Sequence, residues 1–371
     1  MSVLAAIAVL AVLIIVHELG HFLAARWQGI HVNRFSIGFG PILLKYQGAE
    51  TEYAVRAFPL GGFVGFPDDD PDSTIPEDDP NLLRNRPLLD RAIVISAGVI
   101  ANLIFAYLVL VLQIGSTGVP EGFNTEPGIE IPQVVSVESP AARAGLQAGD
   151  VILSIDGQSL GEGEDAIWAF KHAVENNPER ELSLSVRRPT QENGTQEYQN
   201  LSLSVIPEIG ADGNGRIGVQ LAPHGDPVYR RPNGIGEVVA LAAERFQSIF
   251  VTTLQGFYRL ITQFSETAGQ LAGPVGIVAQ GADAAQRDAV NLLVFAAVVS
   301  INLAIINILP LPALDGGQLA FLLVEGLRGK PVPVHIQDGV MQSGLLFLLG
   351  LGIFLIVRDT TQLEWVQQLT R

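Results

Sequence analysis

Long apolar runs recur along the 371-residue chain and separate more polar stretches. The runs cover Val3 to Trp27, Ala92 to Ile114, Ala289 to Leu314 and Val340 to Val357. A helix needs about 20 apolar residues to cross the hydrocarbon core of a bilayer. The last run has eighteen residues, which is near the lower limit. The pattern therefore predicts four transmembrane helices, and three of the four runs contain no Asp, Glu, Lys or Arg.

Basic residues orient these four spans. Seven of them lie between the first and second span, namely Arg26, Arg34, Lys45, Arg56, Arg84, Arg86 and Arg91. No Lys or Arg occurs from Ile114 to Ala142. Because basic residues are enriched in cytoplasmic loops, we expect the first loop to be cytoplasmic, and the N-terminus and the long middle region to be external. The first and third spans then run in the same direction, so their C-terminal ends lie at similar depths.

Residues 29–67 have the pattern of a β-hairpin. Two glycine-rich apolar segments, Phe35 to Pro41 and Phe58 to Phe63, enclose a turn at Gln47–Gly48, and Thr51 to Phe58 partly alternates between apolar and polar residues. Non-helical backbone enters a membrane only beside protein or a water-filled cavity. We interpret this segment as a membrane-re-entrant β-hairpin; the alternative is a peripheral hairpin on the cytoplasmic side.

An external α+β domain is expected in residues 131–206. Strand-like and helical segments alternate there: Val151 to Ile155, Glu164 to Asn176, Leu182 to Val186 and Leu201 to Val205. Asp156–Gly157 follows the first of these strands and is typical of a tight turn. A single compact domain between the second and third spans is therefore predicted.

Two other regions are polar or amphipathic. Residues 68–91 begin with an acidic, proline-containing run and are expected to form a solvated cytoplasmic linker. Residues 207–288 form an external amphipathic region. Within it, Gly234 to Phe264 is too polar to span a membrane, so we expect a helix on the external membrane surface.

Composition supports a membrane protein and excludes several chemistries. Charged residues make up 16% of the chain, against about a quarter in soluble domains, and the mean hydropathy is +0.33. The chain has no cysteine, which excludes disulfides, Cys-zinc sites and thiol nucleophiles. Its net charge of −16 argues against binding to nucleic acid.

The first span carries the pattern His-Glu-Leu-Gly-His, from His17 to His21. Residues i and i+4 share one face of a helix, so the two imidazoles can bind one metal ion, and Glu18 can act as general base. His17 lies roughly 22 Å along a helix, still inside a hydrocarbon core of about 30 Å. Ionisable groups at that depth are costly and mark functional sites. The alternative is a helix face that happens to carry two histidines.

The third span ends with a second candidate group, Asp315, in the sequence Asn-Ile-Leu-Pro-Leu-Pro-Ala-Leu-Asp-Gly-Gly. Pro310 and Pro312 remove backbone donors and stop the helix. A catalytic zinc site takes three protein ligands, so Asp315 can complete the set begun by the two histidines. Asn307 lies eight residues earlier and could stabilise the oxyanion of a tetrahedral intermediate. If the first and third spans did not end at similar depths, Asp315 would be interpreted only as part of a helix end and turn.

These motifs carry a family resemblance. The chain resembles the site-2 proteases, a family of intramembrane zinc metalloproteases, of the bacterial regulator-of-sigma-E protease type. The matching strings are H-E-L-G-H, F-S-I-G-F-G-P, P-L-G-G-F-V, A-G-V-I-A-N, L-A-G-P-V-G-I-V and N-I-L-P-L-P-A-L-D-G-G. A further string, from Ser139 to Ile152, resembles a bacterial PDZ domain, a fold that binds peptides by adding a strand to a sheet edge.

The resemblance implies roles for particular residues. Zn²⁺ would be bound by His17, His21 and Asp315, with Glu18 as general base and Asn307 assisting. The re-entrant hairpin would offer an edge strand to the substrate, which points to Thr51, Glu52, Tyr53, Ala54 and Val55 as substrate-binding residues. Asn102 in the second span would help helix packing or substrate unwinding. The chain departs from many relatives in having one PDZ domain and in having Val99 where a proline is common.

The expected protein is thus a polytopic α-helical membrane protein with four transmembrane helices, a re-entrant β-hairpin and an inserted α+β PDZ domain. We assign the membrane helices and their motifs to residues 1–28, 92–114, 289–317 and 340–357. The expected partners are the lipid bilayer, transmembrane protein substrates and a peptide or substrate ectodomain at the PDZ domain. The PDZ domain could instead act only as a spacer or size filter. The membrane is a bacterial inner membrane or an organelle membrane of bacterial descent.

The expected activity is hydrolysis of peptide bonds within transmembrane segments, as in the regulated release of an anti-sigma factor or transcription regulator. Three alternatives stay open: cleavage of remnant signal peptides, an inactive PDZ membrane scaffold and a zinc transporter. The intact His-Glu-x-x-His pattern argues against a scaffold. A single metal site with an activating glutamate and a PDZ domain argues against transport.

Overall fold

Four long apolar helices traverse the helical part of the computed structural model: α1 (Ser2–Trp27), α2 (Leu88–Thr117), α8 (Ala289–Ile308) and α10 (Val334–Thr361). Each is long and apolar enough to cross a membrane, which confirms the prediction of four spans. The structure describes residues 2–70, 73–136, 138–192, 195–210, 213–264 and 271–361. These form two compact units. The helical unit comprises Met1–Thr117 and Pro232–Arg371, and the inserted unit comprises Gly118–Arg231.

Three spans have ends that differ from the expected ones, and α2 extends past the expected residues 92–114 at both ends. Helix α10 starts directly after Pro333 rather than at Val340, because its first turns carry polar residues that a search for apolar runs passes over. Helix α8 ends at Ile308, before Pro310 and Pro312, which cannot donate backbone hydrogen bonds. A new helix, α9 (Asp315–Arg328), then begins at the candidate ligand itself.

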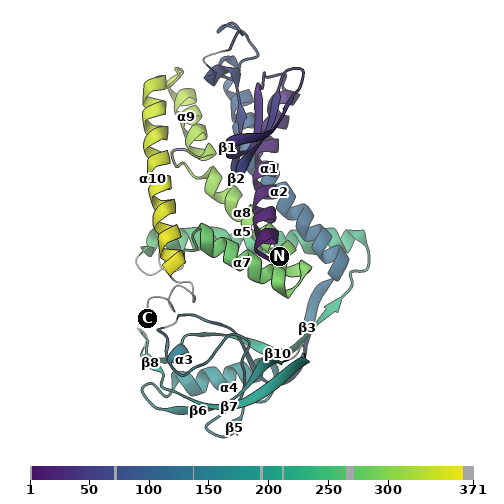
Figure 1. Ribbon diagram of the computed structural model, residues 1–371, viewed down its shortest axis with the longest axis vertical. Helices are drawn as coiled ribbons and strands as arrows, with labels where there is room; N and C mark the ends of the chain where they lie inside the picture. Colours follow the sequence, from purple (N-terminus) through teal and green to yellow (C-terminus); the bar gives the residue numbers. More distant parts are fainter. Residues whose placement is uncertain are drawn as a thin grey trace. The chain divides into compact units, whose positions relative to one another are not determined.

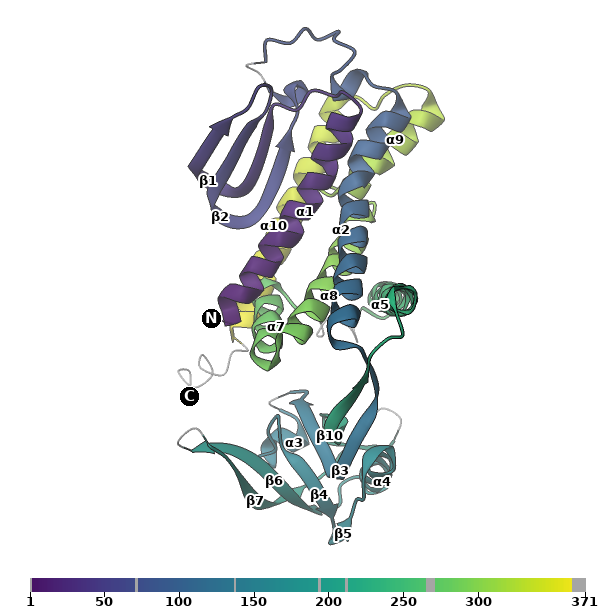
Figure 2. The same cartoon turned by 90° about the vertical axis from the view of Figure 1, so that its right-hand side faces the viewer.

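Helices α1 and α2 cross unusually closely because glycines face each other's helix (Figure 2). A Cβ atom on Gly20 would lie 2.4 Å from the Ala97 carbonyl oxygen and 2.7 Å from the Ala101 Cβ. A Cβ atom on Gly98 would lie 2.3 Å from Nε2 of His21. Such small residues let membrane helices approach at backbone distance.

The re-entrant segment is a small sheet rather than a simple hairpin. Strands β1 (Arg34–Gln47) and β2 (Glu52–Gly65) each fold back on themselves, and their register gives four strand segments. Residues 42–47 pair with 52–56, residues 52–55 also pair with 34–37, and 34–37 pair in turn with 62–65. Gly38 has a positive φ of 85°, and a Cβ there would lie 2.6 Å from the Phe58 carbonyl oxygen, so the fold-back of β1 needs this glycine.

This register changes the expectation for the substrate-binding strand. The segment from Glu52 to Val55 is paired on both sides, so it is an interior strand, and the expectation that it offers a free edge is wrong. The edges of the sheet are instead residues 42–47 and residues 62–65. Alternation along Thr51 to Phe58 indicated a strand correctly but could not reveal its neighbours, because those pairings join residues distant in sequence.

The sheet packs against α1, on the side away from α2 (Figure 2). The ring of Phe22 in α1 contacts Phe35 and Tyr53 with centroid distances of 5.2 and 6.0 Å. At Gly62 a Cβ would lie 3.6 Å from Ile14 and 3.0 Å from Glu18. Because Ile14 and Glu18 belong to the first span, the sheet lies alongside the middle of α1, as we expect of a re-entrant segment.

The acidic segment after the sheet is tied to its surroundings rather than being a freely solvated linker. Asp68 accepts backbone hydrogen bonds from Leu83 and Arg84, and Asp70 accepts one from the side chain of Asn33. Two short 3-10 turns, Pro67–Asp69 and Leu83–Asn85, flank this part. Residues 71 and 72 of the expected linker lie outside the described residues.

Two amphipathic helices precede α8. Helix α5 (Ile235–Thr262) runs across the direction of α1 and α2 (Figure 1), and the Tyr107 hydroxyl of α2 donates to the Val239 carbonyl at 3.1 Å. Helix α7 (Pro274–Arg287) follows α5 in the described residues. Asp359 of α10 accepts a hydrogen bond from the Gly276 backbone at 2.9 Å and so holds the first turn of α7.

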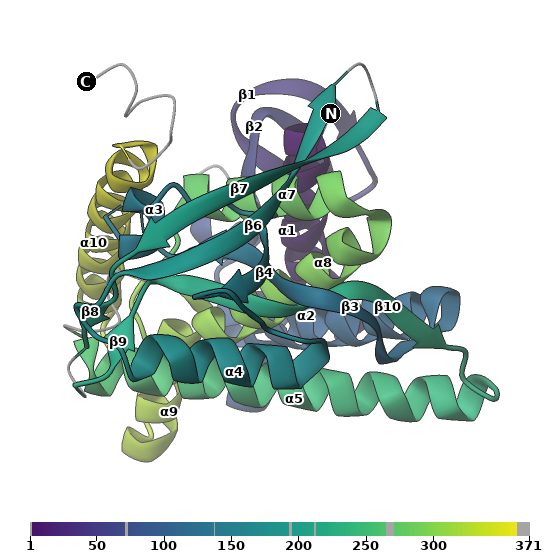
Figure 3. The same cartoon turned by 90° about the horizontal axis from the view of Figure 1, so that it is seen from below.

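The inserted unit is an antiparallel sheet with one long helix against it (Figure 3). Its strands run in the order β10–β3–β4–β6–β7. In chain order the elements are β3 (Val119–Val134), α3 (Pro140–Arg143), β4 (Val151–Ile155), β5 (Gln158–Ser159), α4 (Gly163–Glu175), β6 (Leu182–Glu192), β7 (Thr195–Val205), β8 (Glu208–Ile209), β9 (Gly215–Arg216) and β10 (Val219–Arg230). The α+β PDZ-type insert expected from the sequence is therefore present.

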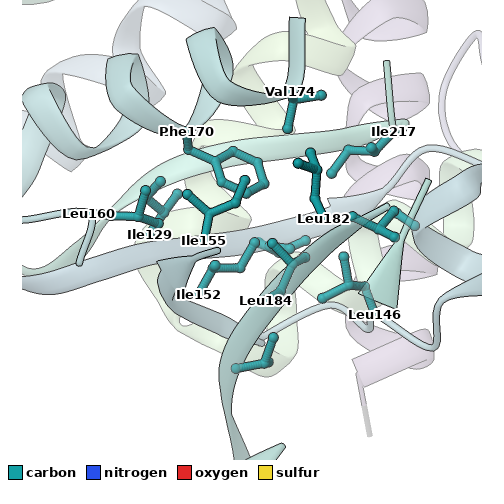
Figure 4. Close-up of a cluster of buried hydrophobic side chains, with 14 of the residues drawn as sticks. Ile129, Leu146, Ile152, Ile155, Leu160, Phe170, Val174, Leu182, Leu184 and Ile217 are labelled. Carbon is teal, nitrogen blue, oxygen red and sulfur yellow. The ribbon is translucent and has the colours of Figure 1, made fainter. Parts of the chain in front are cut away.

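The core of the inserted unit lies between the sheet and α4 (Figure 4). Phe170 of α4 is buried against Ile152 and Leu184 of the sheet. The unit extends beyond the expected residues 131–206 because β3 and β10 pair along their whole length, from Val119 with Arg230 to Val134 with Val219. Prolines and a glycine interrupt the alternation in β10, which hid this strand from a reading of the sequence.

One buried ion pair joins two parts of this unit. Asp150 is fully buried and accepts two hydrogen bonds from the Arg188 guanidinium, each at 2.7 Å, and one from the Gln147 backbone at 2.9 Å. The guanidinium also donates to the Gly145 carbonyl at 2.7 Å. A buried carboxylate satisfied in this way is strongly destabilising when its partner is lost.

We therefore expect Arg188→Met to destabilise the inserted unit by about 3–5 kcal/mol, because it leaves a buried charge unpaired. Hydrogen exchange of the full-length protein in detergent would measure the loss in β4 and β6. The matched control is Arg143→Met, which removes the exposed pair with Glu208 and should cost about 1 kcal/mol or less. Equal protection in both variants would contradict a special role for the Asp150 pair.

Candidate metal centre

The two histidines of the first span converge on one point. His17 and His21 lie one turn apart on α1, and their Nε2 atoms are 3.2 Å apart. The rings meet edge to face with their centroids 4.8 Å apart. Two imidazole nitrogens directed at the same place, with no proton needed between them, are the arrangement that a shared metal ion produces.

Asp315 reaches the same point from the start of α9. Its Oδ2 atom lies 3.1 Å from Nε2 of His17 and 3.4 Å from Nε2 of His21. The break after α8 makes this possible, and it depends on Gly316, where a Cβ would lie 2.1 Å from the Leu309 carbonyl oxygen. The chain therefore brings together residues almost 300 positions apart, as the depth argument from the sequence anticipated.

The three ligand atoms fit a zinc ion. Within the described residues, His17, His21 and Asp315 form a group that can hold a metal. Atoms bound to one zinc at about 2.0–2.1 Å with tetrahedral angles lie about 3.3 Å from each other, close to the three distances seen here. Oδ2 of Asp315 is buried without a conventional hydrogen-bond partner among the described residues. A nitrogen–nitrogen–oxygen donor set with an open fourth position is that of a catalytic zinc site.

Groups around the ligands hold the imidazoles in place. Nδ1 of His21 lies 2.8 Å from the Val94 carbonyl of α2, so this nitrogen carries the hydrogen and Nε2 is free to bind a metal. The amide nitrogen of Asn307 lies 3.4 Å from Nε2 of His17 and is therefore beside the metal position. Asn102 lies against the other ring nitrogen of His17, 3.3 Å from Nδ1.

Glu18 faces a cavity of about 390 Å³ that also contains the three ligands. Its carboxylate accepts a hydrogen bond from the backbone of Val64, in the edge strand of the sheet. Gly62, Phe63, Val64 and Phe66 line the same cavity, together with Val94 and Gln318. The sequence pattern does not predict these sheet residues as site residues, although the glycine pair in P-L-G-G-F-V signals a close backbone approach.

The residues expected to bind substrate lie elsewhere. Thr51 is buried and donates to the Val32 carbonyl at 2.7 Å, and Glu52 pairs with Lys45 at 2.6 Å. Tyr53, Ala54 and Val55 line a separate apolar hollow of about 250 Å³ on the sheet. Asn102 is completely buried. None of these six residues lines the cavity beside Glu18, as far as the described residues extend.

Gly98 forms the wall of the site on the side of α2. A Cβ there would lie 2.3 Å from Nε2 of His21 and 2.8 Å from Cε1 of His17. Real Cβ atoms do not tolerate such distances, and both neighbours are held by other contacts. The positions of the two imidazoles therefore require glycine here.

A histidine pair and a carboxylate beside a glutamate, set within membrane helices, define the class of intramembrane metalloproteases. Residues 5–351 match the profile of peptidase family M50. A protein of Nostoc sp. (strain PCC 7120) that carries the provisional name of a zinc metalloprotease is 61% identical over 374 residues, covering 100% of both chains. The chain belongs to peptidase family M50, and it is a membrane metalloprotease.

The chain is also similar to other membrane proteases and to a solved PDZ-domain structure. The chloroplastic membrane metalloprotease ARASP of Arabidopsis thaliana is 48% identical, over 99% of this chain and 80% of that protein. The regulator of sigma-E protease RseP of Escherichia coli is 30% identical, over 94% of this chain and 96% of that protein. A PDZ-domain crystal structure from Listeria monocytogenes is 21% identical, covering 26% of this chain and 90% of that chain, with a TM-score of 0.19.

The geometry of Gly98 makes a direct prediction. Gly98→Ala should push His21 away from the metal position and weaken metal binding at least as much as the loss of an outer-shell partner, about 10–100-fold. Chelator competition on the purified variant would measure this. Gly115→Ala is the matched control on the same helix, because its nearest neighbour would be 3.7 Å away. Metal affinity equal to that of the wild type in Gly98→Ala would mean that α2 does not confine the ligands.

Proposed function

We propose that this protein is a zinc-dependent protease that hydrolyses peptide bonds within transmembrane segments, with His17, His21 and Asp315 as zinc ligands and Glu18 as general base. The observation that carries the proposal is the convergence of two Nε2 atoms and one carboxylate oxygen beside Glu18, at the depth of the first span. Bound zinc supplies Lewis-acid polarisation of the scissile carbonyl and activation of water.

The protein groups divide the remaining work. Glu18 takes a proton from the attacking water and passes it to the leaving amine, the usual task of a positioned carboxylate. The Val64 backbone hydrogen bond holds the Glu18 side chain in the cavity. Asn307, with its amide nitrogen beside His17, is positioned to donate to the oxyanion as it forms.

We assign substrate pairing to residues 62–65 rather than to Thr51–Val55. This strand pairs with residues 34–37 on one side only, and its residues 62–64 line the cavity beside Glu18. A helix buries its carbonyls in internal hydrogen bonds, so a transmembrane substrate must unwind before it is cut. An extended segment can then pair with a free strand edge.

The expected substrates are transmembrane proteins, as the names of relatives that regulate sigma factors suggest. We assign the protein to a bacterial inner membrane or to an organelle membrane of bacterial descent, the second in view of the chloroplastic relatives. The inserted unit acts as a filter on the substrate's external part, because a domain attached on the external side blocks bulk without needing a sequence-specific groove.

The role of Glu18 is tested by Glu18→Gln. This change should leave zinc content and folding unchanged and reduce turnover by about 10²–10⁴-fold, because only proton transfer is removed. Cleavage of a transmembrane substrate in detergent and metal analysis of the same preparation measure the two effects. Glu244→Gln, at an exposed position of α5, is the control. A Glu18→Gln enzyme with near-normal turnover would rule out Glu18 as the base.

The filter role is tested by removing the inserted unit. Val119 pairs with Arg230, so residues 119–230 can be replaced by a short Gly-Ser linker. Two substrates should share one transmembrane segment, and only one should carry a bulky external domain. We expect cleavage of the short substrate to stay within about threefold and the bulky one to become a substrate; a docking module would instead lower cleavage of the short substrate. Continued rejection of the bulky substrate would overturn the filter.

A further inference from the structure

Asn102 lies at a point where three helices meet. It is fully buried in α2, and its amide contacts Nδ1 of His17 in α1. Its own backbone carbonyl accepts a hydrogen bond of 2.8 Å from the Ser300 hydroxyl of α8, which is also fully buried. The Ser300 hydroxyl thus holds the backbone of Asn102, and the Asn102 side chain does not line the cavity. A direct contact with substrate does not fit this position.

The chemistry of His17 decides what its partner must be. Nε2 faces Asp315 and His21, so Nε2 is the nitrogen that binds a metal, and it needs its lone pair. In a neutral imidazole the other nitrogen, Nδ1, then carries the hydrogen and must donate it. The only side-chain group that the structure places against Nδ1 among the described residues is the amide of Asn102.

We infer that the amide oxygen of Asn102 accepts the Nδ1 hydrogen of His17 and thereby fixes the tautomer that presents Nε2 to the metal. Asn102 is a positioning residue for a metal ligand. A half-turn of the amide exchanges Oδ1 and Nδ2, whose positions are assigned from their hydrogen bonds. The structure places Nδ2 toward Nδ1, 3.3 Å away, so that two donors face each other and Oδ1 is buried without a partner among the described residues. With Oδ1 toward Nδ1 a hydrogen bond forms.

The second ligand has the same arrangement. Nδ1 of His21 lies 2.8 Å from the carbonyl of Val94, and a carbonyl can only accept. Val94 and Asn102 both belong to α2, so one helix orients both histidines: one through its backbone and the other through a side chain.

The inference rests on the proposed zinc ligands, and zinc binding alone tests it. Asn102→Leu removes the acceptor at nearly constant size and should weaken zinc binding by about 10–100-fold in chelator competition. Asn102→Asp keeps an acceptor oxygen in either orientation and should bind zinc within a few-fold of the wild type. Gln113→Leu is the matched control, because Gln113 is also buried in α2 and its hydrogen bonds with described residues stay within its own helix, to Thr117 and Ser116.

Three outcomes separate the possibilities. Weak binding by Asn102→Leu with rescue by Asn102→Asp, at equal unfolding temperatures of the chelated proteins, supports the inference. An Asn102→Asp variant as weak as Asn102→Leu, or an Asn102→Leu variant that binds like the wild type, overturns it. A His17→Ala protein that keeps full zinc content would instead refute the ligand set of the proposed function; loss of zinc from that protein with normal binding by Asn102→Leu refutes only the role of Asn102.

Discussion

The close crossing of α1 and α2 is the constraint on which the rest of the site depends. Gly20 lets α1 approach the Ala97 carbonyl, and Gly98 lets α2 lie directly against the two imidazoles. Only at this distance can the Val94 carbonyl reach His21 and the Asn102 amide reach His17. In a hydrocarbon environment each buried polar group needs such a partner, because no water can replace it. The close packing of α1 against α2 is therefore also what gives the buried polar groups their hydrogen-bond partners.

Helix α2 is also the common partner of the elements that deliver the third ligand. Ser300 ties α8 to the Asn102 carbonyl, and Arg91 pairs with Glu325 of α9 at 2.8 Å in a partly buried position. Asp315 starts α9, so these two contacts place its carboxylate relative to the histidines. Helix α8 ends before Pro310 and Pro312, which lets the chain turn there. The contacts with α2 then fix the position of the turn.

Local patterns in the sequence predicted much of this molecule. Apolar length gave four spans, helical spacing put His17 and His21 on one face, and basic residues placed Asp315 near their depth. The pairing of strands could not be read in the same way. The alternation from Thr51 to Phe58 predicts a strand, but its neighbours are set by contacts distant in sequence, and β10 is hidden by Pro223 and Pro227. The proposed role of Asn102 could not be predicted from the sequence, because a single asparagine in a transmembrane helix does not reveal which residue it contacts.

A β-sheet at membrane depth is expensive, since unpaired backbone groups in hydrocarbon each cost several kcal/mol. The same expense falls on a transmembrane substrate, which must break internal hydrogen bonds before its carbonyl can be attacked. In the proposed mechanism, the edge strand at residues 62–65, beside Glu18, would offset one loss with the other, because the unwound segment and the edge would satisfy each other's donors and acceptors. The glycines at 61 and 62 would then bring bare backbone, rather than side chains, to the place where we propose that the substrate backbone lies.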